Sequence, residues 1–255
     1  MIRPWDNPGQ RALPVATIAI YSLKGGVGKT TLAVNLAWSA AMQSSRRTLL
    51  WDLDPQAASS FLLTQRADSP SARAQAQSAF VKDGTPDALI EKTATPRLDL
   101  IAADASLRRL DLLFHEMDKK KRLQKLLVGL RKEYDRILLD CPPGLTETSD
   151  QVMRAADLIV VPVIPSPLSE RAFAEVTRHL GQRAAIMPVH SMVDRRRKLH
   201  ADALERHPDW PVIPMASLIE QVGTRRAAVG SFAPRSAAAA AFALLWQAIE
   251  RRIAA

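Results

Sequence analysis

The sequence predicts an α/β protein with a mostly parallel, doubly wound sheet and helices on both faces. Short apolar runs alternate with helix-like segments along the chain, which is the pattern that strand–helix–strand units produce. A glycine-rich turn separates the first apolar run from the first helix-like segment, as a phosphate-binding loop requires. In open sheets of this kind, ligands bind outside the carboxyl ends of the strands. We therefore expect a phosphate-binding crevice at that edge.

Seven apolar runs predict the strands, and five segments predict long helices. The strands are expected at residues 15–20, 48–53, 98–102, 136–139, 156–163, 184–192 and 211–215. The helices are expected at 32–42, from about 57, at 106–131, from about 169 to 180 and at 236–253, with a short helix between turns at 68–71 and 82–86. The last helix has one apolar face, which we expect to pack against the sheet.

Length and composition favour one domain preceded by a short leader. At 255 residues the chain is long enough to bury a large core. Residues 1–14 contain three prolines and no apolar segment of the kind found in signal peptides, so we expect a flexible leader and a single domain over 15–255. No apolar run is long enough to span a membrane, and the one cysteine, Cys141, excludes an internal disulfide. A cytoplasmic protein is expected.

The charge balance indicates a polyanionic partner. The formal net charge is +9 and the isoelectric point is about 10.1. Nucleic acid and an anionic membrane surface are the two partners that such an excess favours. The alternative is a soluble protein with an arginine-rich surface and no polyanionic ligand.

The glycine-rich turn has the residues of a phosphate-binding loop. Its glycines would let backbone N–H groups surround phosphate oxygens at the start of a helix. Lys29 would reach the β- and γ-phosphates, and the Thr30 hydroxyl would ligate Mg²⁺. The segment expected to bind the nucleotide consists of Lys24, Gly25, Gly26, Val27, Gly28, Lys29, Thr30 and Thr31.

Asp52 and Asp54 lie at the carboxyl end of the second expected strand. A carboxylate at a strand end could hold Mg²⁺ or a water bound to it, or orient an attacking water. Alternatively, the Asp-x-Asp-Pro turn could cap the helix that begins near residue 57.

Asp140 follows the strand at 136–139, in the pattern of a Walker B motif. It would hold Mg²⁺, most simply through a bound water. Pro142 and Pro143 stop the strand directly after it. Cys141 is expected to be a small residue packed at the strand tip.

Together these three motifs predict a P-loop nucleoside triphosphatase, and they resemble one family in particular. The loop K-G-G-x-G-K-T-T has Lys24 before the glycine pair, which is similar to the deviant Walker A loop of the ParA/MinD ATPases. The segments D-x-D-P-Q and D-C-P-P-G resemble the switch I and switch II segments of that family. The resemblance extends to the terminal helix and is strongest to ParA-type partition ATPases.

The resemblance implies a slow ATPase that works as a switch. ATP with Mg²⁺ would lie between two subunits of a homodimer, and Lys24 of one subunit would reach the phosphates held by the other. Lys24, Lys29 and Asp54 are the implied catalytic residues, with Asp54 orienting the attacking water. Thr30, Asp54, Asp140 and Asp52 are the implied magnesium residues, Asp52 as a support of the metal's surroundings. Pro214 and Met215 stand where the family holds adenine, although Met215 replaces a frequent aromatic residue.

The resemblance also implies a role for the excess of basic residues. Members of this family bind DNA without sequence preference in the ATP-bound dimer, through basic residues near the C-terminal part. The candidate residues here are Arg195, Arg225, Arg226, Arg235 and Arg251. Arg195 could instead serve the nucleotide, and any of these arginines could be ordinary surface. Association with the nucleoid is the implied location.

Several functions remain open. The main alternative is a MinD-like protein that binds membrane, but the alanine-rich helix at 236–253 fits core packing better. A nitrogenase-reductase type would need interface cysteines, and a tyrosine kinase of this loop type would need a C-terminal tyrosine cluster; neither is present. A ParB-like protein or a cargo adaptor is the expected stimulating partner. The cargo could be a plasmid, a chromosome region or a protein assembly.

Overall fold

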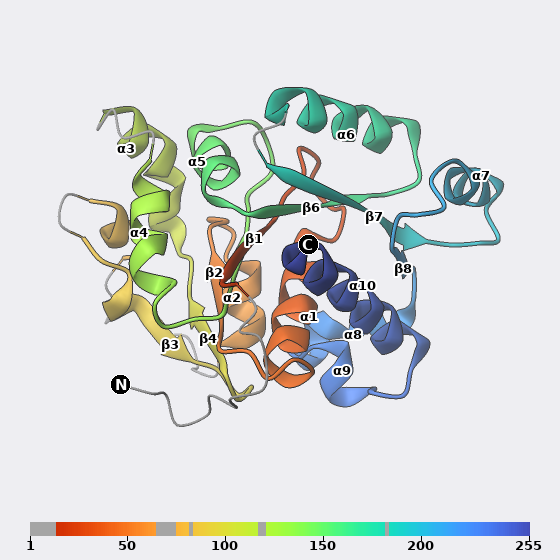
Figure 1. The fold of residues 1–255 in the computed structure, drawn as a ribbon, viewed down its shortest axis with the longest axis horizontal. Helices are drawn as coiled ribbons and strands as arrows, with labels where there is room; N and C mark the ends of the chain where they lie inside the picture. The colour runs from red at the N-terminus through yellow and green to blue at the C-terminus, as the bar shows by residue number, and fades with distance from the viewer. Residues whose placement is uncertain (1–13, 65–74, 82–83, 117–120, 182–183) are drawn as a thin grey trace.

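A single twisted sheet runs through the centre of the molecule (Figure 1). The computed structural model describes residues 14–64, 75–81, 84–116, 121–181 and 184–255, and within these ranges the sheet has eight strands. The strand order is β3-β4-β2-β5-β1-β6-β7-β8, and every neighbouring pair is parallel except β3 with β4. The strands are β1 (Ala16–Ile20), β2 (Thr48–Asp52), β3 (Ile90–Lys92), β4 (Leu98–Ile101), β5 (Arg136–Asp140), β6 (Leu158–Val163), β7 (Ala185–Val193) and β8 (Val212–Pro214). All seven predicted strands are present, and β3 is an addition.

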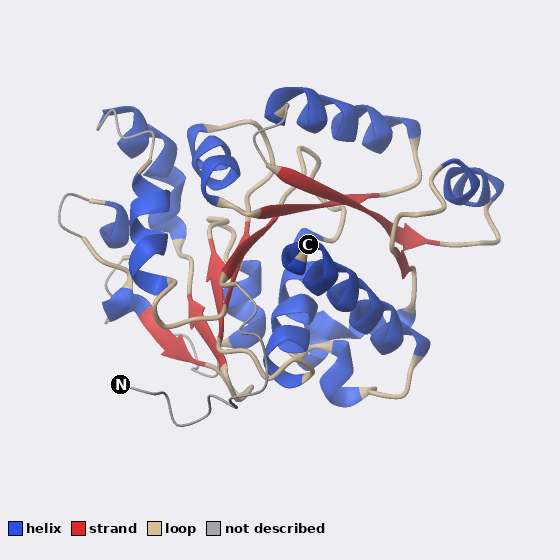
Figure 2. Cartoon of the chain, in the orientation of Figure 1, coloured by secondary structure: helices blue, strands red, loops and turns tan. Residues whose placement is uncertain are grey.

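Helices cover both faces of the sheet (Figures 1 and 2), as the sequence predicts. One face carries α3 (Leu110–Glu116), α4 (Arg122–Leu130), α5 (Glu147–Ala155) and α6 (Pro167–Leu180). The other carries α1 (Lys29–Met42), α2 (Ala58–Leu63), α8 (Ser217–Arg225), α9 (Val229–Phe232) and α10 (Ala237–Ala254). Helix α7 (Lys198–Arg206) lies beyond the β8 edge in Figure 1. Short 3₁₀ segments occur at η2 (Ala76–Phe80), η3 (Asp87–Leu89) and η4 (Ala105–Arg109).

The helices differ from the prediction in two ways. The single helix expected at 106–131 is instead η4, α3 and α4, with residues 117–120 outside the described ranges. Helices α5, α7, α8 and α9 were not predicted, although α5 begins with a capping box between Thr146 and Ser149. The turn at 68–71, residues 82–83 and residues 1–13 of the expected leader also lie outside the described residues.

The side chains of β1 and of Tyr21, the residue after it, alternate between the two cores. Ile18 and Ile20 pack in the core beneath α1 and α10, whereas Ala19 and Tyr21 pack in the core beneath α5 and α6. The chain passes from β1 to β2 and later returns to place β5 between them. The carboxyl ends of β1, β2 and β5 are therefore neighbours, which is where an open α/β sheet binds its ligand.

Helix α10 packs its apolar stripe into the core. Phe242, Leu245, Trp246 and Ile249 are all buried there, against elements that include α1. This confirms the prediction that the terminal helix covers the sheet. Among the described helices, none combines the length and the apolar character that crossing a membrane would need.

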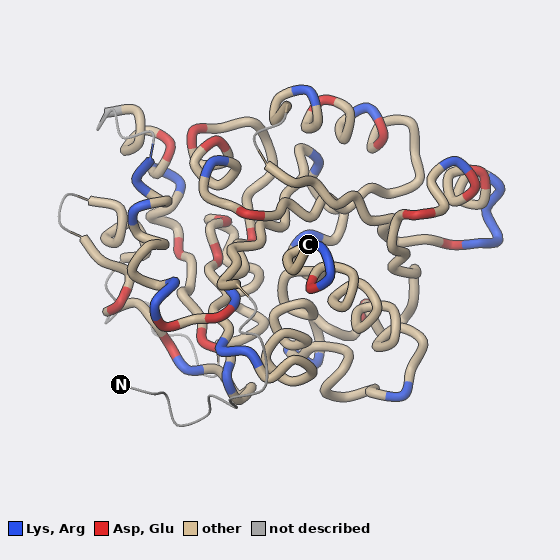
Figure 3. The backbone as a smooth tube through the Cα atoms, viewed as in Figure 1, with Lys and Arg blue, Asp and Glu red and all other residues tan. Residues whose placement is uncertain are grey.

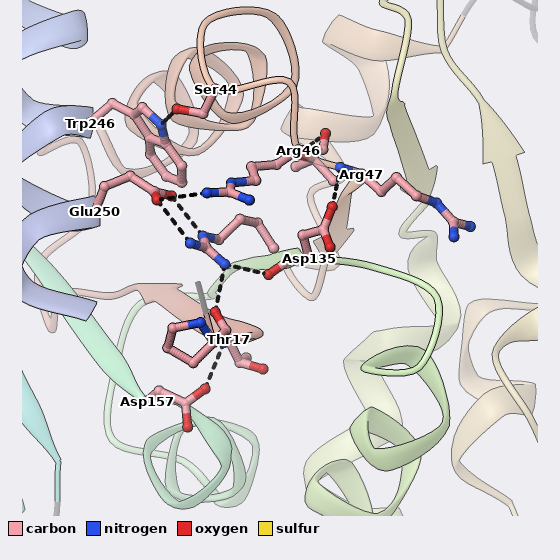
Figure 4. A network of polar contacts seen from close by, with 11 residues as sticks. Thr17, Ser44, Arg46, Arg47, Asp135, Asp157, Trp246 and Glu250 are labelled. Carbon is pink, nitrogen blue, oxygen red and sulfur yellow. Dashed lines mark hydrogen bonds and ion pairs between the residues drawn. The ribbon is translucent and has the colours of Figure 1, made fainter. Parts of the chain in front are cut away.

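A polar network fastens α10 to the amino edge of the sheet (Figure 4). Arg136, at the start of β5, is fully buried and donates from Nε and Nη2 to the two carboxylate oxygens of Glu250, at 2.7 and 2.8 Å. Its Nη1 donates to the carbonyls of Pro14 and Asp135. The Trp246 indole donates to Ser44 Oγ at 2.8 Å. The end of α10 is thus held by charge-assisted, bidentate contacts.

Candidate nucleotide-binding site

The loop between β1 and α1 is shaped to hold an anion. Gly26 and Gly28 have positive φ angles of 71° and 92°, a conformation that residues with side chains rarely adopt. Helix α1 begins directly after Gly28, which has no side chain to cap it. The first N–H groups of α1 therefore remain available, and the helix dipole adds partial positive charge at the same place.

Lys29 is a buried cation at this helix start. Its side chain is only 7% exposed, and Nζ donates to the Lys24 carbonyl at 3.3 Å. Burial lowers the pKa of Lys29, while the nearby carboxylates of Asp140 and Asp54 oppose that shift. A buried ammonium beside a loop of backbone N–H groups suits a ligand that carries several negative charges.

Asp140 at the end of β5 contributes a buried carboxylate. Its Oδ2 accepts a hydrogen bond from Ser59 Oγ at 2.6 Å, but Oδ1 is buried and has no hydrogen-bond partner among the described residues. Burial raises the pKa of Asp140 most, the hydrogen bond from Ser59 and the nearby Thr30 hydroxyl oppose the rise, and the charge of Asp54 adds to it. An unpaired carboxylate oxygen beside the Thr30 hydroxyl is a donor set that fits Mg²⁺.

Asp52 is fully buried, and both its oxygens are occupied by the protein. Oδ1 accepts from the Asp54 N–H at 3.0 Å, and Oδ2 accepts from the N–H and the hydroxyl of Ser60 at 2.9 and 2.7 Å. Burial and the proximity of Asp140 raise the pKa of Asp52. Asp52 therefore accepts an N–H of the first turn of α2, as the capping alternative expects, although the N-cap residue itself, Ala57, makes no side-chain cap. The same contacts suit the supporting role expected of this residue.

Asp54 and Lys24 lie close to these groups. The half-buried Asp54 accepts from the Gln56 N–H at 2.9 Å, and its charge acts on both Lys29 and Asp140. The half-buried Lys24 donates its backbone N–H to Ser22 Oγ at 3.2 Å. The catalytic roles of both residues remain predictions.

The sequence did not predict a role for three hydroxyl groups of the site. Ser59 and Ser60 position Asp140 and Asp52, as described above. Tyr21, fully buried, donates its hydroxyl to the carbonyl of Gly144 in the loop after Asp140, at 2.9 Å. Only the position of Tyr21 directly before the loop could have suggested its role, because such contacts depend on tertiary structure.

The expected adenine residues lie at the end of β8. Met215 is 58% exposed, and its N–H donates to the Val193 carbonyl at 2.9 Å. Pro214 is in register with Val193 of β7. Their contact with a base remains a prediction.

The candidate DNA-binding arginines do not form one surface within the chain. Arg195 follows β7 at the carboxyl edge, whereas Arg251 is next to Arg252, which lines a cavity at the amino ends of β1, β6 and β7. Arg225 packs over the Phe232 ring, near the loop that holds Arg235. Figure 3 likewise shows Lys and Arg on several separate parts of the molecule.

Arg226 is engaged inside the chain. Its Nε and Nη2 donate to the carbonyls of Phe61 and Thr64 at 2.7 and 2.6 Å, and its guanidinium lies over the Phe61 ring. These contacts fasten the end of α8 to α2. Arg226 is therefore the weakest of the five candidates for a DNA contact.

Comparison with known proteins identifies the family. A family model described as an AAA domain (AAA_31) matches residues 15–184, and the chromosome partitioning protein ParA of Caulobacter vibrioides is 33% identical over 203 residues, covering 74% of this chain and 73% of that protein. The chain belongs to the ParA/MinD family of ATPases. The sporulation initiation inhibitor protein Soj of Bacillus subtilis is 36% identical over 148 residues, 57% of each chain. The ParA of Myxococcus xanthus is 35% identical, and the matched part spans only 54% of its length.

Solved structures of ParA/MinD-type proteins have the same fold. The septum site-determining protein MinD of Pyrococcus horikoshii, complexed with Mg-ADP, has a TM-score of 0.78 at 22% identity, covering 93% of this chain and 96% of that one. Apo McdA of Cyanothece has a TM-score of 0.76 at 22% identity, covering 92% and 99%. A second McdA structure contains ATP. At 22% identity, these likenesses concern the fold.

Proposed function

We propose that the chain is a ParA-like ATPase that forms an ATP-dependent sandwich homodimer and binds DNA non-specifically in that state. Hydrolysis of ATP to ADP and phosphate would release it and so partition or position a cargo. The observation that carries this proposal is the group formed by the unpaired Asp140 Oδ1, the buried Lys29 and the uncapped start of α1. Mg²⁺ would supply a partner for the Asp140 oxygen, and a triphosphate would supply negatively charged partners for Lys29 and for the N–H groups at the start of α1.

In the proposed site, Thr30 and Asp140 hold Mg²⁺, directly or through water, with Asp54 nearby and Asp52 as support. Mg²⁺, when bound, would neutralise charge on the β- and γ-phosphate oxygens. Lys29 and the backbone N–H groups of residues 25–31 bind the phosphate chain. Asp54 orients the attacking water, because it is the acidic residue of the site whose side chain is only half-buried.

Lys24 is proposed to act across the dimer. A cation that reaches the partner's phosphates couples hydrolysis to dimerisation, because charge develops there in the transition state. We expect Lys24→Ala to abolish ATP-dependent dimers in light scattering and Asp54→Ala to accumulate them. Lys125→Ala, at an exposed position of α4, is a matched control for the loss of a lysine. Normal dimers of the Lys24 variant would reject this role.

DNA binding is proposed for the ATP state. Electrophoretic mobility shifts with ATP and with ADP test it directly. We expect the double variant Arg225→Ala/Arg235→Ala to weaken binding most, since these exposed residues lie in the same region, and each lost phosphate contact to reduce the slope of log affinity against log salt by about 1. Arg195→Ala and Arg251→Ala are tested separately because they lie at other edges. Salt-independent binding would contradict the proposal.

A membrane-bound, MinD-like function is the alternative. It needs an apolar helix face that can leave the protein. The apolar stripe of α10 is buried, and Glu250 joins the helix to Arg136. Both observations favour the DNA-binding function over the membrane-bound one. Sedimentation with anionic liposomes in ATP separates the two: co-sedimentation without DNA binding would favour the membrane function.

The partner and location follow from the proposed cycle. Slow turnover calls for a stimulating protein, a ParB-like protein or a cargo adaptor. A DNA-bound dimer would be cytoplasmic and associated with the nucleoid. Stimulation of ATPase activity by the product of a neighbouring gene would identify the cargo class.

A further inference from the structure

Strand β7 departs from regular geometry at its carboxyl end. Its pairing with β8 shifts register between His190 and Val193, and Met192 has a positive φ of 55°. A non-glycine residue in this conformation is strained unless its surroundings require it. The irregular end of β7 lies against the phosphate loop.

Ser191 makes the contact between β7 and that loop. Its side chain is buried, with the residue 2% exposed, and Oγ donates to the Val27 carbonyl at 2.8 Å. A Cβ on Gly28 would lie 3.2 Å from Ser191 Oγ and 3.5 Å from Met192 Cε. The β7 end is therefore packed directly on the Val27–Gly28 peptide.

This hydrogen bond fixes the orientation of one peptide group. In a planar trans peptide the carbonyl and the following N–H point in opposite directions. With the Val27 oxygen held on Ser191, the Gly28 N–H points away from β7. Gly28 directly precedes α1, so this N–H belongs to the set that surrounds an anion at the helix start.

We propose that Ser191 is a positioning residue for the nucleotide phosphates, because its hydroxyl holds the Val27–Gly28 peptide so that the Gly28 N–H faces the phosphate chain. The proposal rests on the proposed nucleotide-binding function of the loop. The contact of Ser191 with Val27 links the ends of β7 and β8, where the base is expected, to the loop that would hold the phosphates. Without the hydroxyl, the peptide could rotate and the N–H would have to be reoriented at each binding event.

The test compares Ser191→Ala with Ser191→Thr in the full chain. Calorimetric titration with Mg-ATP and Mg-ADP gives affinities, and steady-state hydrolysis gives KM and kcat. We expect S191A to lose about ten-fold in affinity for both nucleotides, because the Gly28 N–H would form a weaker hydrogen bond to a charged phosphate, and S191T to retain wild-type affinity. Because the contact exists before the chemical step, KM rises and kcat changes little.

The outcomes separate the possibilities. Unchanged affinity in S191A, or an equal loss in S191A and S191T, overturns the positioning role; the second result would assign the effect to packing. If S191A does not fold, Ser191→Cys takes its place, because a thiol is a much weaker hydrogen-bond donor: reduced affinity of S191C supports the proposal, and wild-type affinity overturns it. Wild-type protein that binds no ATP at all would instead reject the proposed function.

Discussion

Buried charged groups at the amino ends of the strands, here called the amino edge, have different surroundings from those at the carboxyl ends, the carboxyl edge. At the amino edge, the buried guanidinium of Arg136 has four hydrogen bonds, two of them to Glu250 (Figure 4). At the carboxyl edge, Asp140 keeps one unpaired buried oxygen and Lys29 donates only to a carbonyl among the described residues. Both edges are built from strand ends of the same sheet, so the difference lies in the partners and not in the fold.

The difference separates stability from function. A buried charge with its partner in place holds elements together, and removing that partner is costly. A buried charge without a partner lowers stability until a ligand supplies one. The amino edge is therefore expected to govern the stability of the chain, and the carboxyl edge its response to nucleotide.

The largest effect is expected for Asp140→Asn. Loss of the carboxylate should reduce Mg²⁺-dependent ATP hydrolysis on the order of 100-fold. The nucleotide-free variant should melt at or above the wild-type temperature, because a neutral amide avoids the desolvation that raises the pKa of Asp140. Phosphate release and thermal melting measure the two quantities. Full activity of this variant would remove Asp140 from the site.

Arg136→Ala should show the reverse pattern. Leaving Glu250 without its main partner should lower the free energy of unfolding by about 3–5 kcal/mol, measured by denaturant titration. The affinity of the folded protein for ATP should stay within about two-fold of wild type, because the network lies at the opposite edge.

A double variant, Arg136→Met/Glu250→Leu, serves as the control for that change. Apolar side chains of similar size should recover much of the lost stability, because the buried pair of Arg136 and Glu250 is removed as a unit. Recovery should be incomplete, because Arg46 also loses its 3.9 Å ion pair with Glu250. No recovery would mean that the loss arises from packing and not from the unpaired carboxylate.

The stability of the nucleotide-free chain should fall as the pH rises. Both Asp52 and Asp140 have a pKa raised above the usual 3.8, so the folded chain binds these protons more tightly than the unfolded chain. Their contribution to stability is complete below pH 3.8 and is lost as the pH rises through the raised pKa values. Between pH 4 and pH 8 the free energy of unfolding of the nucleotide-free wild type should therefore fall by on the order of 1 kcal/mol more than that of Asp140→Asn. Parallel stability curves for the two proteins would contradict the shared burial of the two carboxyls.

The smallest effect is expected for Tyr21→Phe. It removes the hydrogen bond to the Gly144 carbonyl and should cost about 1 kcal/mol. Tyr134→Phe is a matched control, because its hydroxyl donates to Asp99 on β4, away from the site. Both variants should be destabilised, but only the Tyr21 variant should change kcat. Equal kcat values for the two would show that the Gly144 contact does not affect turnover.

The parallel strands and the phosphate loop could be predicted from sequence because their signals are local. A strand buried on both faces, such as β6, is a continuous apolar run, and the loop needs its glycines in fixed positions. Strand β3 could not be predicted because, of its three residues Ile90–Lys92, two are partly buried and Lys92 is exposed, and they pair antiparallel at the edge of the sheet. Such a segment has no distinctive periodicity.

Contacts between distant segments could not be predicted. Nothing in the Arg225–Arg226 pair indicates that one guanidinium packs on Phe232 while the other binds carbonyls of α2. Ser59 and Ser191 were missed for the same reason, since their partners lie 81 and 164 residues away. These contacts appear only once the helices have been packed on the sheet.

The two outermost strands restrict how copies of the chain can assemble. Among the described residues, the sheet ends in β3 and β8, each only three residues long, and β8 closes with Pro214. Short edges that contain lysine or proline are poor templates for an added strand. Filaments that grow by extending the sheet from one molecule to the next are therefore disfavoured. A higher-order array is expected instead through the helical faces or the carboxyl ends of the strands, where the proposed hydrolysis would take it apart.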